Sequence, residues 1–359
     1  MSQPPYRFPS LVADCHTLLL RLAGRVPDGL IAEARDRLVA EDLRGLAASM
    51  AMAVVERDVS LTGPDADLLT GLLNSAGADH ARLSRVRRQS GDPAPEWEFA
   101  PAPLPVLRAH RERIGRCLDL TDAGDLALAD GLLDERDLAL IGLVADRPGV
   151  LALWRAWRFP PSGPPGPRAK RVYLAEVAAG TDPSLLALGA QIALSEQGEA
   201  DPQVEVYTAA SSPPAYQRAA RARSSLLWAP VPPHSFHRAS VYDAVDGEAG
   251  PRFHTDHPLV TDPARRDRLL DYLTSAATIR DNPILRDDAV NRSRRSVVPW
   301  SVRTDGVWIW SEAVAYYLRE HALAPSADFL AHLGDAGNRP PSLDTVSWFR
   351  ARAALYRTT

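Results

Sequence analysis

Four histidines, arranged as two pairs with HxxH spacing, are the side chains best suited to hold a metal ion. They are His234, His237, His254 and His257. A hairpin turn at Asp246-Gly247 would bring the two pairs together, and imidazole nitrogens are common ligands of zinc. However, residues i and i+3 of a strand face opposite sides of a sheet, so one pair cannot bind one metal ion without a bulge or a loop. The sequence therefore predicts no bound metal ion, and a metal site at these histidines is its third interpretation.

Arginines and aspartates are concentrated between residues 280 and 303. They are Arg280, Asp281, Arg286, Asp287, Asp288, Arg292, Arg294, Arg295 and Arg303. This segment carries a net charge of +3, whereas the formal charge of the whole chain is −4. A guanidinium group binds a carboxylate or a phosphate through two parallel hydrogen bonds, so the cluster can hold an anionic ligand. A solvated loop with internal ion pairs is the competing interpretation.

Tryptophans accompany this segment in a predicted β-hairpin. Trp300 precedes the turn at Thr304-Asp305-Gly306, and Trp308 and Trp310 follow it. The last two are two residues apart, so they share one face of the second strand. An exposed aromatic row beside arginines would suit a partner protein or a stacked base. Packing under the following helix would instead place the row in the core, which is the interpretation that the sequence favours.

No recognised catalytic or cofactor-binding motif accompanies these residues. The chain has no GxGxxG turn after a strand, no P-loop, no GxSxG elbow, no HExxH motif and no EF-hand loop. Cys15 and Cys117 are far apart in the chain, which excludes a CxxC redox or zinc pair. The sequence therefore predicts no cofactor and identifies no catalytic residue.

The composition is that of a folded protein without membrane spans. Hydrophobic residues make up 45% and charged residues 24% of the chain, as in average globular proteins. The formal charge of −4 argues against a nucleic-acid coat and against a polybasic membrane binder. No apolar window reaches the roughly 20 residues of a membrane span, and residues 1–9 do not resemble a signal peptide. We therefore expect a cytoplasmic bacterial protein whose partner is neither a membrane nor a nucleic acid.

The N-terminal half is predicted to be helical. Apolar residues recur at spacings of three and four between residues 10 and 88, and further helices are predicted over 106–117 and over 138–157, the latter interrupted near Pro148. Proline is concentrated at 93–105 and 160–167, where it prevents helix continuation. The predicted organisation is a helical domain over 1–90, a Pro-rich linker over 91–106, a helical segment over 107–158 that packs on the first domain, and a Pro-rich linker over 159–168.

Residues 169–359 are predicted to form an α+β domain. Strands over 171–177 and 203–208 flank a helix over 183–196, which makes a βαβ unit. The other predicted elements are a helix from 213 to 227, a hairpin of 237–244 with 251–255, a helix over 262–277, a hairpin of 297–303 with 307–310, and helices from 311, near 329 and over 342–356. The fold class is α+β overall, with an all-α N-terminal half of helical hairpins or a small bundle before this mixed-sheet domain.

Two functions of different classes fit these residues. The first is a non-catalytic protein-binding or regulatory protein, whose C-terminal domain presents an Arg/Trp surface to another protein. The second is an enzyme that binds an anionic small molecule or nucleotide in the same domain, near strand ends and a helix start. The candidate binding residues for the two functions are Arg280, Asp281, Arg294, Arg295, Trp300, Asp305, Trp308, Trp310 and Glu312. The sequence leaves open whether the chain is an enzyme.

Overall fold

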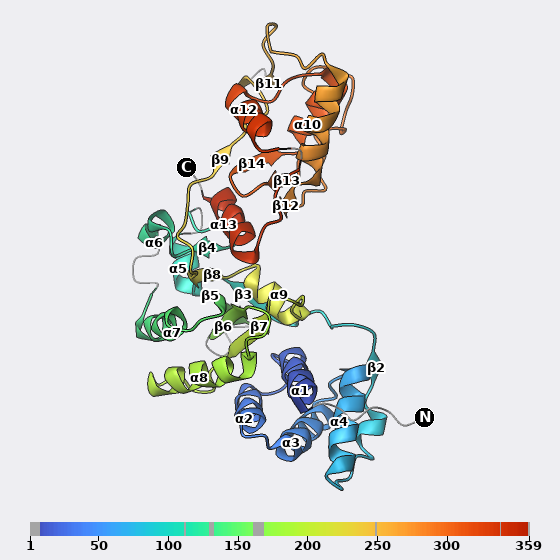
Figure 1. Ribbon diagram of the computed structural model, residues 1–359, viewed down its shortest axis with the longest axis vertical. Helices are drawn as coiled ribbons and strands as arrows, with labels where there is room; N and C mark the ends of the chain where they lie inside the picture. Colours follow the sequence, from blue (N-terminus) through green and yellow to red (C-terminus); the bar gives the residue numbers. More distant parts are fainter. Residues whose placement is uncertain are drawn as a thin grey trace. The chain divides into compact units, whose positions relative to one another are not determined.

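The computed structural model describes residues 8–110, 113–128, 133–160, 169–247, 250–337 and 339–357. Two compact units divide the chain, the first ending at Pro232 and the second beginning at Pro233 (Figure 1). We call them the N-terminal unit and the C-terminal unit. Both units contain helices and strands, so the predicted α+β class is confirmed. Within the described ranges, no helix is long and apolar enough to cross a membrane.

Four helices begin the N-terminal unit and confirm the helical pattern predicted between residues 10 and 88. They are α1 (Phe8–Leu22), α2 (Asp28–Val39), α3 (Leu43–Glu56) and α4 (Gly63–Ser75). Side-chain caps fix two of their starts, because Asp42 accepts a hydrogen bond from the Gly45 amide and Thr62 accepts one from the Asp65 amide. The apolar faces of the four helices share one core. A short parallel pair lies beside this bundle, formed by β1 (Leu61–Thr62) and β2 (Arg88–Gln89).

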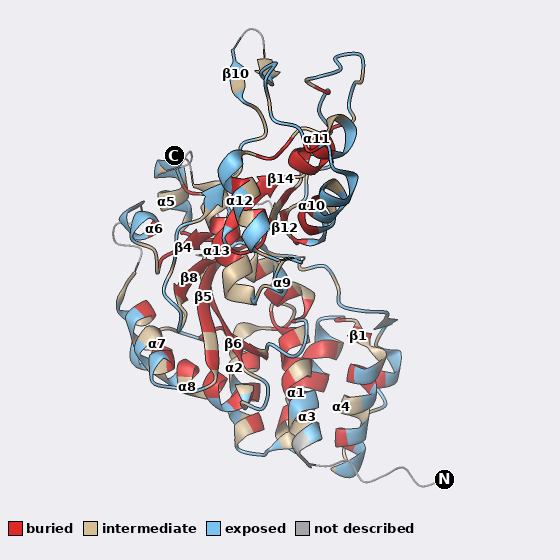
Figure 2. Ribbon diagram, turned by 45° about the horizontal axis from the view of Figure 1, so that its top comes forward, coloured by how far each residue is buried: buried red, intermediate tan, exposed pale blue. Residues whose placement is uncertain are grey.

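A six-stranded sheet completes the N-terminal unit. Its strands are β3 (Glu98–Ala100), β4 (Leu118–Asp119), β5 (Val150–Phe159), β6 (Lys170–Val177), β7 (Val204–Thr208) and β8 (Ser225–Trp228). The order is β4-β8-β5-β6-β7, and β3 pairs with β5. The predicted βαβ unit is confirmed, because β6 and β7 are parallel and α8 (Pro183–Glu196) connects them. Figure 2 shows in red how β5 and β8 are buried.

The helix predicted over 138–157 is wrong beyond Ala145. Here α7 (Glu135–Ala145) is capped by Asp134, and Gly149, with a φ of +85°, turns the chain into β5. The central strand β5 pairs with β6 on one side and with β8 on the other, and most of its residues are buried. A strand covered on both faces carries apolar residues at successive positions, so its pattern cannot be distinguished from that of a buried helix.

Other predicted boundaries also differ from the structure. The helices α5 (Leu104–Ala109) and α6 (Ala123–Leu128) are short, and the helix predicted from 213 to 227 is replaced by α9 (Ala215–Arg221) followed by β8. Strand β3 lies within the first predicted linker and pairs with β5. Residues 161–168 of the second predicted linker lie outside the described residues. The two compact units divide at neither linker, because both predicted linkers lie within the first unit.

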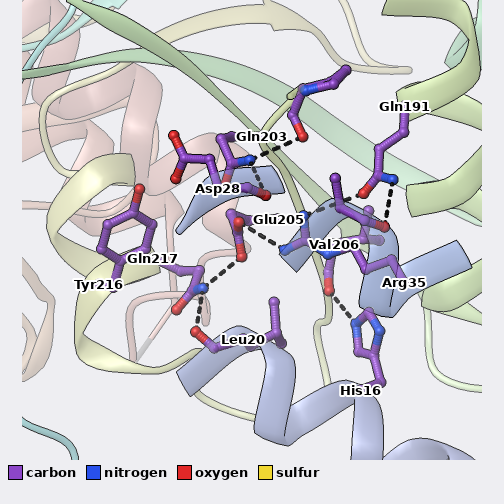
Figure 3. A network of polar contacts seen from close by, with 12 residues as sticks. His16, Leu20, Asp28, Arg35, Gln191, Gln203, Glu205, Val206, Tyr216 and Gln217 are labelled. Atoms are coloured by element: carbon purple, nitrogen blue, oxygen red, sulfur yellow. Dashed lines mark hydrogen bonds and ion pairs between the residues drawn. The ribbon is translucent and has the colours of Figure 1, made fainter. Parts of the chain in front are cut away.

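The bundle contacts the sheet through a buried network of charged and amide side chains (Figure 3). Arg35 of α2 pairs with Glu205 of β7 at 2.8 Å, and the exposed fractions of these side chains are 2% and 0%. Gln217 of α9 donates hydrogen bonds to the other oxygen of Glu205 and to the Leu20 carbonyl of α1. The network therefore ties two bundle helices and α9 to one strand of the sheet.

A second buried contact in Figure 3 makes the stability of this unit depend on pH. His16 of α1 donates from Nε2 to the Val206 carbonyl at 2.7 Å and accepts from the Ser184 hydroxyl. Burial lowers the pKa of His16 from its ordinary value of 6.5 to about 4, and the positive charge of Arg35 acts in the same direction. The folded protein therefore keeps His16 neutral at a pH where the unfolded chain protonates this residue.

We expect the free energy of unfolding of the N-terminal unit to fall as the pH decreases from 6.5 toward 4. The stability from neutral His16 is fully present above the unfolded pKa and is lost as the pH falls through the folded pKa, because the unfolded state then binds the extra proton. The loss should approach about 3 kcal/mol. Urea denaturation at several pH values measures it, with His16→Gln as the non-titrating control. If the unfolding free energies of the wild type and of His16→Gln changed equally with pH over this range, a lowered pKa of His16 would be contradicted.

The C-terminal unit is a four-stranded sheet with helices packed on both faces. The strands are β9 (His237–Arg238), β12 (Ala277–Arg280), β13 (Val302–Thr304) and β14 (Trp308–Ser311), in the order β12-β13-β14-β9. The helices are α10 (Pro263–Ser275), α11 (Ala313–His321), α12 (Ala327–Asp335) and α13 (Thr345–Tyr356). Trp310 packs in a core shared with α10, α11 and α12, whereas Ile309 packs in a core shared with α13.

Most elements predicted for this unit are confirmed. Strands β13 and β14 form the antiparallel hairpin around the turn at 304–306, and the helices predicted from 262, 311 and 342 are present. The hairpin predicted at Asp246-Gly247 is confirmed only for β10 (Ala244–Asp246) and β11 (Gly250–Arg252). Its predicted extension back to His237 is wrong, because β9 pairs in parallel with β14 instead.

Candidate functional site

The hairpin tryptophans lie in the core of the C-terminal unit. Trp308 is buried and Trp310 is 1% exposed. Both rings pack against Phe329 of α12, with ring centroids 4.9 and 5.2 Å away. The Trp310 indole also donates a hydrogen bond to the Leu273 carbonyl at 3.2 Å. These two residues therefore belong to the core, as the sequence favoured, and they are not part of an exposed aromatic row.

Asp305 fixes the turn between the two strands. One carboxylate oxygen accepts from the Val307 and Trp308 amides at 3.0 and 2.8 Å. The other accepts from the Tyr272 hydroxyl at 3.0 Å and from His332 Nε2 at 2.6 Å. Burial opposes ionisation of this carboxyl, but the four hydrogen bonds outweigh burial and lower the pKa of Asp305. The residue is therefore an ionised anchor of the hairpin.

The arginines of the predicted anion site pair with separate carboxylates. Arg294 pairs with Glu320 at 2.9 Å, Arg295 pairs with Asp287, and Arg303 pairs with Glu312 at 2.7 Å. Arg280 is half-buried at the end of β12, and Asp281 beside it is exposed. Among the described residues, no hydrogen bond or ion pair joins Arg280 or Asp281 to the other candidates. The internal ion pairs of a solvated loop therefore describe this segment better than a single anion site.

The four candidate metal-binding histidines have separate partners. His234 donates to the Gly306 carbonyl at 2.7 Å, and the His237 ring stacks on Trp308 with centroids 5.0 Å apart. His257 contacts the Asp243 carboxylate at 2.9 Å and the Ala324 carbonyl at 3.0 Å. His254 is exposed and contributes its backbone amide to Asp243. In the part of the chain that the structure describes, no group of three or more His, Cys, Asp or Glu side chains is placed to hold a metal ion.

The arginine-rich segment is organised around Asp288, which the sequence identified only as one of the acidic residues of the cluster. The segment forms an irregular hairpin, in which Arg286 bridges to Val298 and the Asp288 amide donates to the Arg294 carbonyl at 3.0 Å. The Asp288 side chain is 1% exposed. One of its oxygens accepts from the Val290 amide at 2.9 Å and from the next amide along the chain at 3.1 Å. Asp288 thus shapes the tip of the hairpin from inside.

Side chains of α11 hold this tip. The second oxygen of Asp288 accepts from the Tyr316 hydroxyl at 3.0 Å and from His321 Nε2 at 2.7 Å. Tyr317 accepts a hydrogen bond from the Ala289 amide at 3.0 Å. Burial opposes ionisation of Asp288, but hydrogen bonds from His321, the backbone amides and Tyr316 outweigh burial and lower its pKa. An ionised, buried carboxylate therefore fastens the segment to a helix of the unit's core.

Most of the exposed side chains of the same segment are apolar or basic. Ile284 is 70% exposed and Val290 is 49% exposed, and Leu285 between them is also exposed. The exposed arginines are Arg286, Arg292 and Arg295. Trp300 is half-buried beneath, where the Arg286 guanidinium lies 4.6 Å from its ring centroid. We call these exposed side chains of Ile284, Leu285, Arg286, Val290, Arg292 and Arg295 the 284–295 surface.

Sequence reasoning placed Asp288 in the cluster, but it did not connect this residue with Tyr316 or Tyr317. It did not single out His321. The available signal was the i, i+4 spacing of Tyr317 and His321, which places both on one face of a helix. Nothing in the sequence paired that face with Asp288, about thirty positions earlier in the chain.

The C-terminal unit thus offers an apolar and basic surface on a firmly held segment. Its buried carboxylates, Asp288 and Asp305, are ionised and surrounded by hydrogen-bond donors. Comparison of the chain with protein-family models, with curated proteins and with solved structures found no match.

Proposed function

We propose that the protein is a non-catalytic, protein-binding protein of regulatory or accessory type, and that it binds its partner through the 284–295 surface. The observation that carries this proposal is the exposure of Ile284, Leu285 and Val290 among arginines. Large apolar side chains gathered on a surface are typical of interaction sites, and arginine is enriched in protein interfaces.

The segment is held in one conformation by contacts with α11, and this supports a role in binding. Asp288 and α11 hold the hairpin tip in one conformation before any partner arrives. A preorganised segment loses little conformational entropy on binding, so more of the contact energy contributes to affinity. The enzyme alternative has less support, because Arg294, Arg295 and Arg303 are already paired with carboxylates.

The charge of the segment indicates the chemistry of the partner. Residues 284–295 contain four arginines and two aspartates, a net charge of +2 in a chain of net charge −4. Charge complementarity selects partners and speeds their association. We therefore propose that the partner protein presents an apolar patch with an acidic rim.

We expect the double change Ile284→Ser/Val290→Ser to reduce partner capture by at least about tenfold, because it removes two apolar contacts worth roughly 1 kcal/mol or more each. Both side chains are exposed, so the stability of the protein should be unchanged. The measurement is quantitative affinity capture by the full chain from a lysate of its own organism, at about 50 and about 500 mM salt, because salt screens surface charge pairs. The higher salt should also weaken capture.

A matched control is Met52→Ser/Leu138→Ser, since both residues are exposed apolar side chains of the N-terminal unit. This variant should capture the same protein as the wild type. If both double variants still capture the protein, or if both lose it to the same extent, the 284–295 surface is not its binding site.

A further inference from the structure

A cleft of about 210 Å³ lies within the N-terminal unit. Its walls come from the end of α1, the loop after α3, the residue before β2, residues 92–97 and the start of α9. Residues 92–97 fall in the first predicted linker, and here they form one side of the cleft. A volume of about 210 Å³ holds several water molecules. This volume suits a small metabolite rather than a peptide.

The aromatic wall of the cleft is fixed by close packing. Gly24 has a φ of +74°, and a Cβ atom there would lie 2.4 Å from the Tyr216 ring and 3.2 Å from Trp97. The Trp97 indole donates to the Gly24 carbonyl at 2.6 Å. The guanidinium of Arg158 lies 4.3 Å from the Trp97 ring centroid, and Arg158 itself pairs with Asp28 at 2.6 Å. The wall is therefore in place without a ligand.

Four arginines line the cleft, and they differ in their partners. Arg21 pairs with Asp65 at 2.8 Å, and Arg87 pairs with Asp58 at 3.1 Å. The other two, Arg25 and Arg57, form no ion pair with any described residue. The carboxylates that line the cleft are Asp58, Asp92 and Glu96. The lining therefore has one more positive than negative charge, and two of its guanidinium groups are available.

Arg25 is the better placed of these two groups. It is half-buried, and its Nη2 donates to the Ser60 carbonyl at 2.6 Å and to the Ser60 hydroxyl at 3.2 Å. Burial lowers the pKa of Arg25, and the nearby carboxylates, Glu96 foremost, do not offset this effect. A partly desolvated guanidinium with free donors gains more from a bound anion than an exposed one does.

We propose that this cleft binds a small organic anion, whose carboxylate or phosphate group is held by Arg25 and Arg57. The apolar part of the ligand would lie against Trp97 and the proline rings at 93 and 95, which share the lining. Guanidinium groups bind both kinds of anion through paired hydrogen bonds. This site lies in the other unit from the 284–295 surface and is independent of the proposed partner.

Isothermal titration of the full chain tests the site with three probes of similar shape: benzoate, phenyl phosphate and the neutral benzyl alcohol. We expect saturable one-site binding of at least one anion and no binding of the alcohol. Arg25→Gln should weaken binding by about tenfold or more, and Arg57→Gln by several-fold, because each removes one charged donor. The matched control is Arg44→Gln, an exposed arginine of α3 outside the cleft, which should leave binding unchanged.

The outcomes separate the two ligand classes and the proposal itself. Binding of benzoate alone identifies a carboxylic acid, and binding of phenyl phosphate alone identifies a phosphate ester; either result supports the site. Absence of binding by the folded wild type overturns the proposal. Equal weakening by Arg57→Gln and Arg44→Gln also overturns it, because a general effect of net charge would then explain the binding. If Arg25→Gln does not fold, this comparison of Arg57→Gln with Arg44→Gln still decides the question.

Discussion

Replacing Trp310 with alanine should reduce the free energy of unfolding of the C-terminal unit by about 3–5 kcal/mol. The side chain is 1% exposed and packs on Phe329, and its indole donates to the Leu273 carbonyl. Truncation would remove the buried ring, leave a cavity between the sheet and its covering helices, and leave the carbonyl without this donor. Urea denaturation followed by hydrogen exchange reports the two units separately and measures the loss.

Val307→Ala provides the control on the same hairpin, because Val307 is an exposed residue directly before β14. Its replacement should change the unfolding free energy by less than about 0.5 kcal/mol. A loss of under about 1 kcal/mol in Trp310→Ala would contradict the core position of this tryptophan. It would also reopen the interpretation of the hairpin as an exposed aromatic surface.

The second large effect is expected at the buried ion pair of the N-terminal unit. Arg35→Met should cost about 3–5 kcal/mol, because it leaves the Glu205 carboxylate buried without its cation. The double change Arg35→Met/Glu205→Met removes both charges, so its cost should be at least about 2 kcal/mol smaller than the sum of the two single changes. Urea denaturation of the wild type, both single variants and the double variant completes this cycle.

Arg37→Met is the matched control for the cycle, since Arg37 lies on the same helix and pairs with Glu33 at the surface at 2.6 Å. An exposed pair of this kind contributes under about 1 kcal/mol. If the costs of Arg35→Met and Arg37→Met were equal, or if the cycle were additive, the buried pair would not couple α2 to β7.

The parts of the fold that can be predicted from the sequence are those decided by a few neighbouring residues. Asp262 before Pro263 predicts the start of α10, because the side-chain cap and the fixed proline φ act within one turn. The hairpin of β13 and β14 follows from the Asp305-Gly306 turn in the same way. By contrast, the apolar run of β5 also fits a buried helix, because its burial on both faces depends on neighbouring strands that the local sequence does not specify.

The candidate site shows the same division between local and long-range information. The charge of the segment at 280–303 was visible in the sequence, and so were its arginines. The organisation of this segment was not visible in the sequence, because the contacts of Asp288 with Tyr316 and His321 join residues about thirty positions apart. The same limit applies to Arg25, whose cleft is assembled from five separate parts of the chain.

Site-specific photo-crosslinking tests the 284–295 surface most directly. In one variant of the full chain, a photoreactive phenylalanine analogue would replace Val290. In a second variant the same analogue would replace Met52, which is the exposed control. After irradiation in a lysate of the protein's own organism, mass spectrometry identifies the cross-linked species. The proposed function predicts one acidic protein joined at position 290 and absent at position 52. Identical products at both positions, or none at 290, would contradict it.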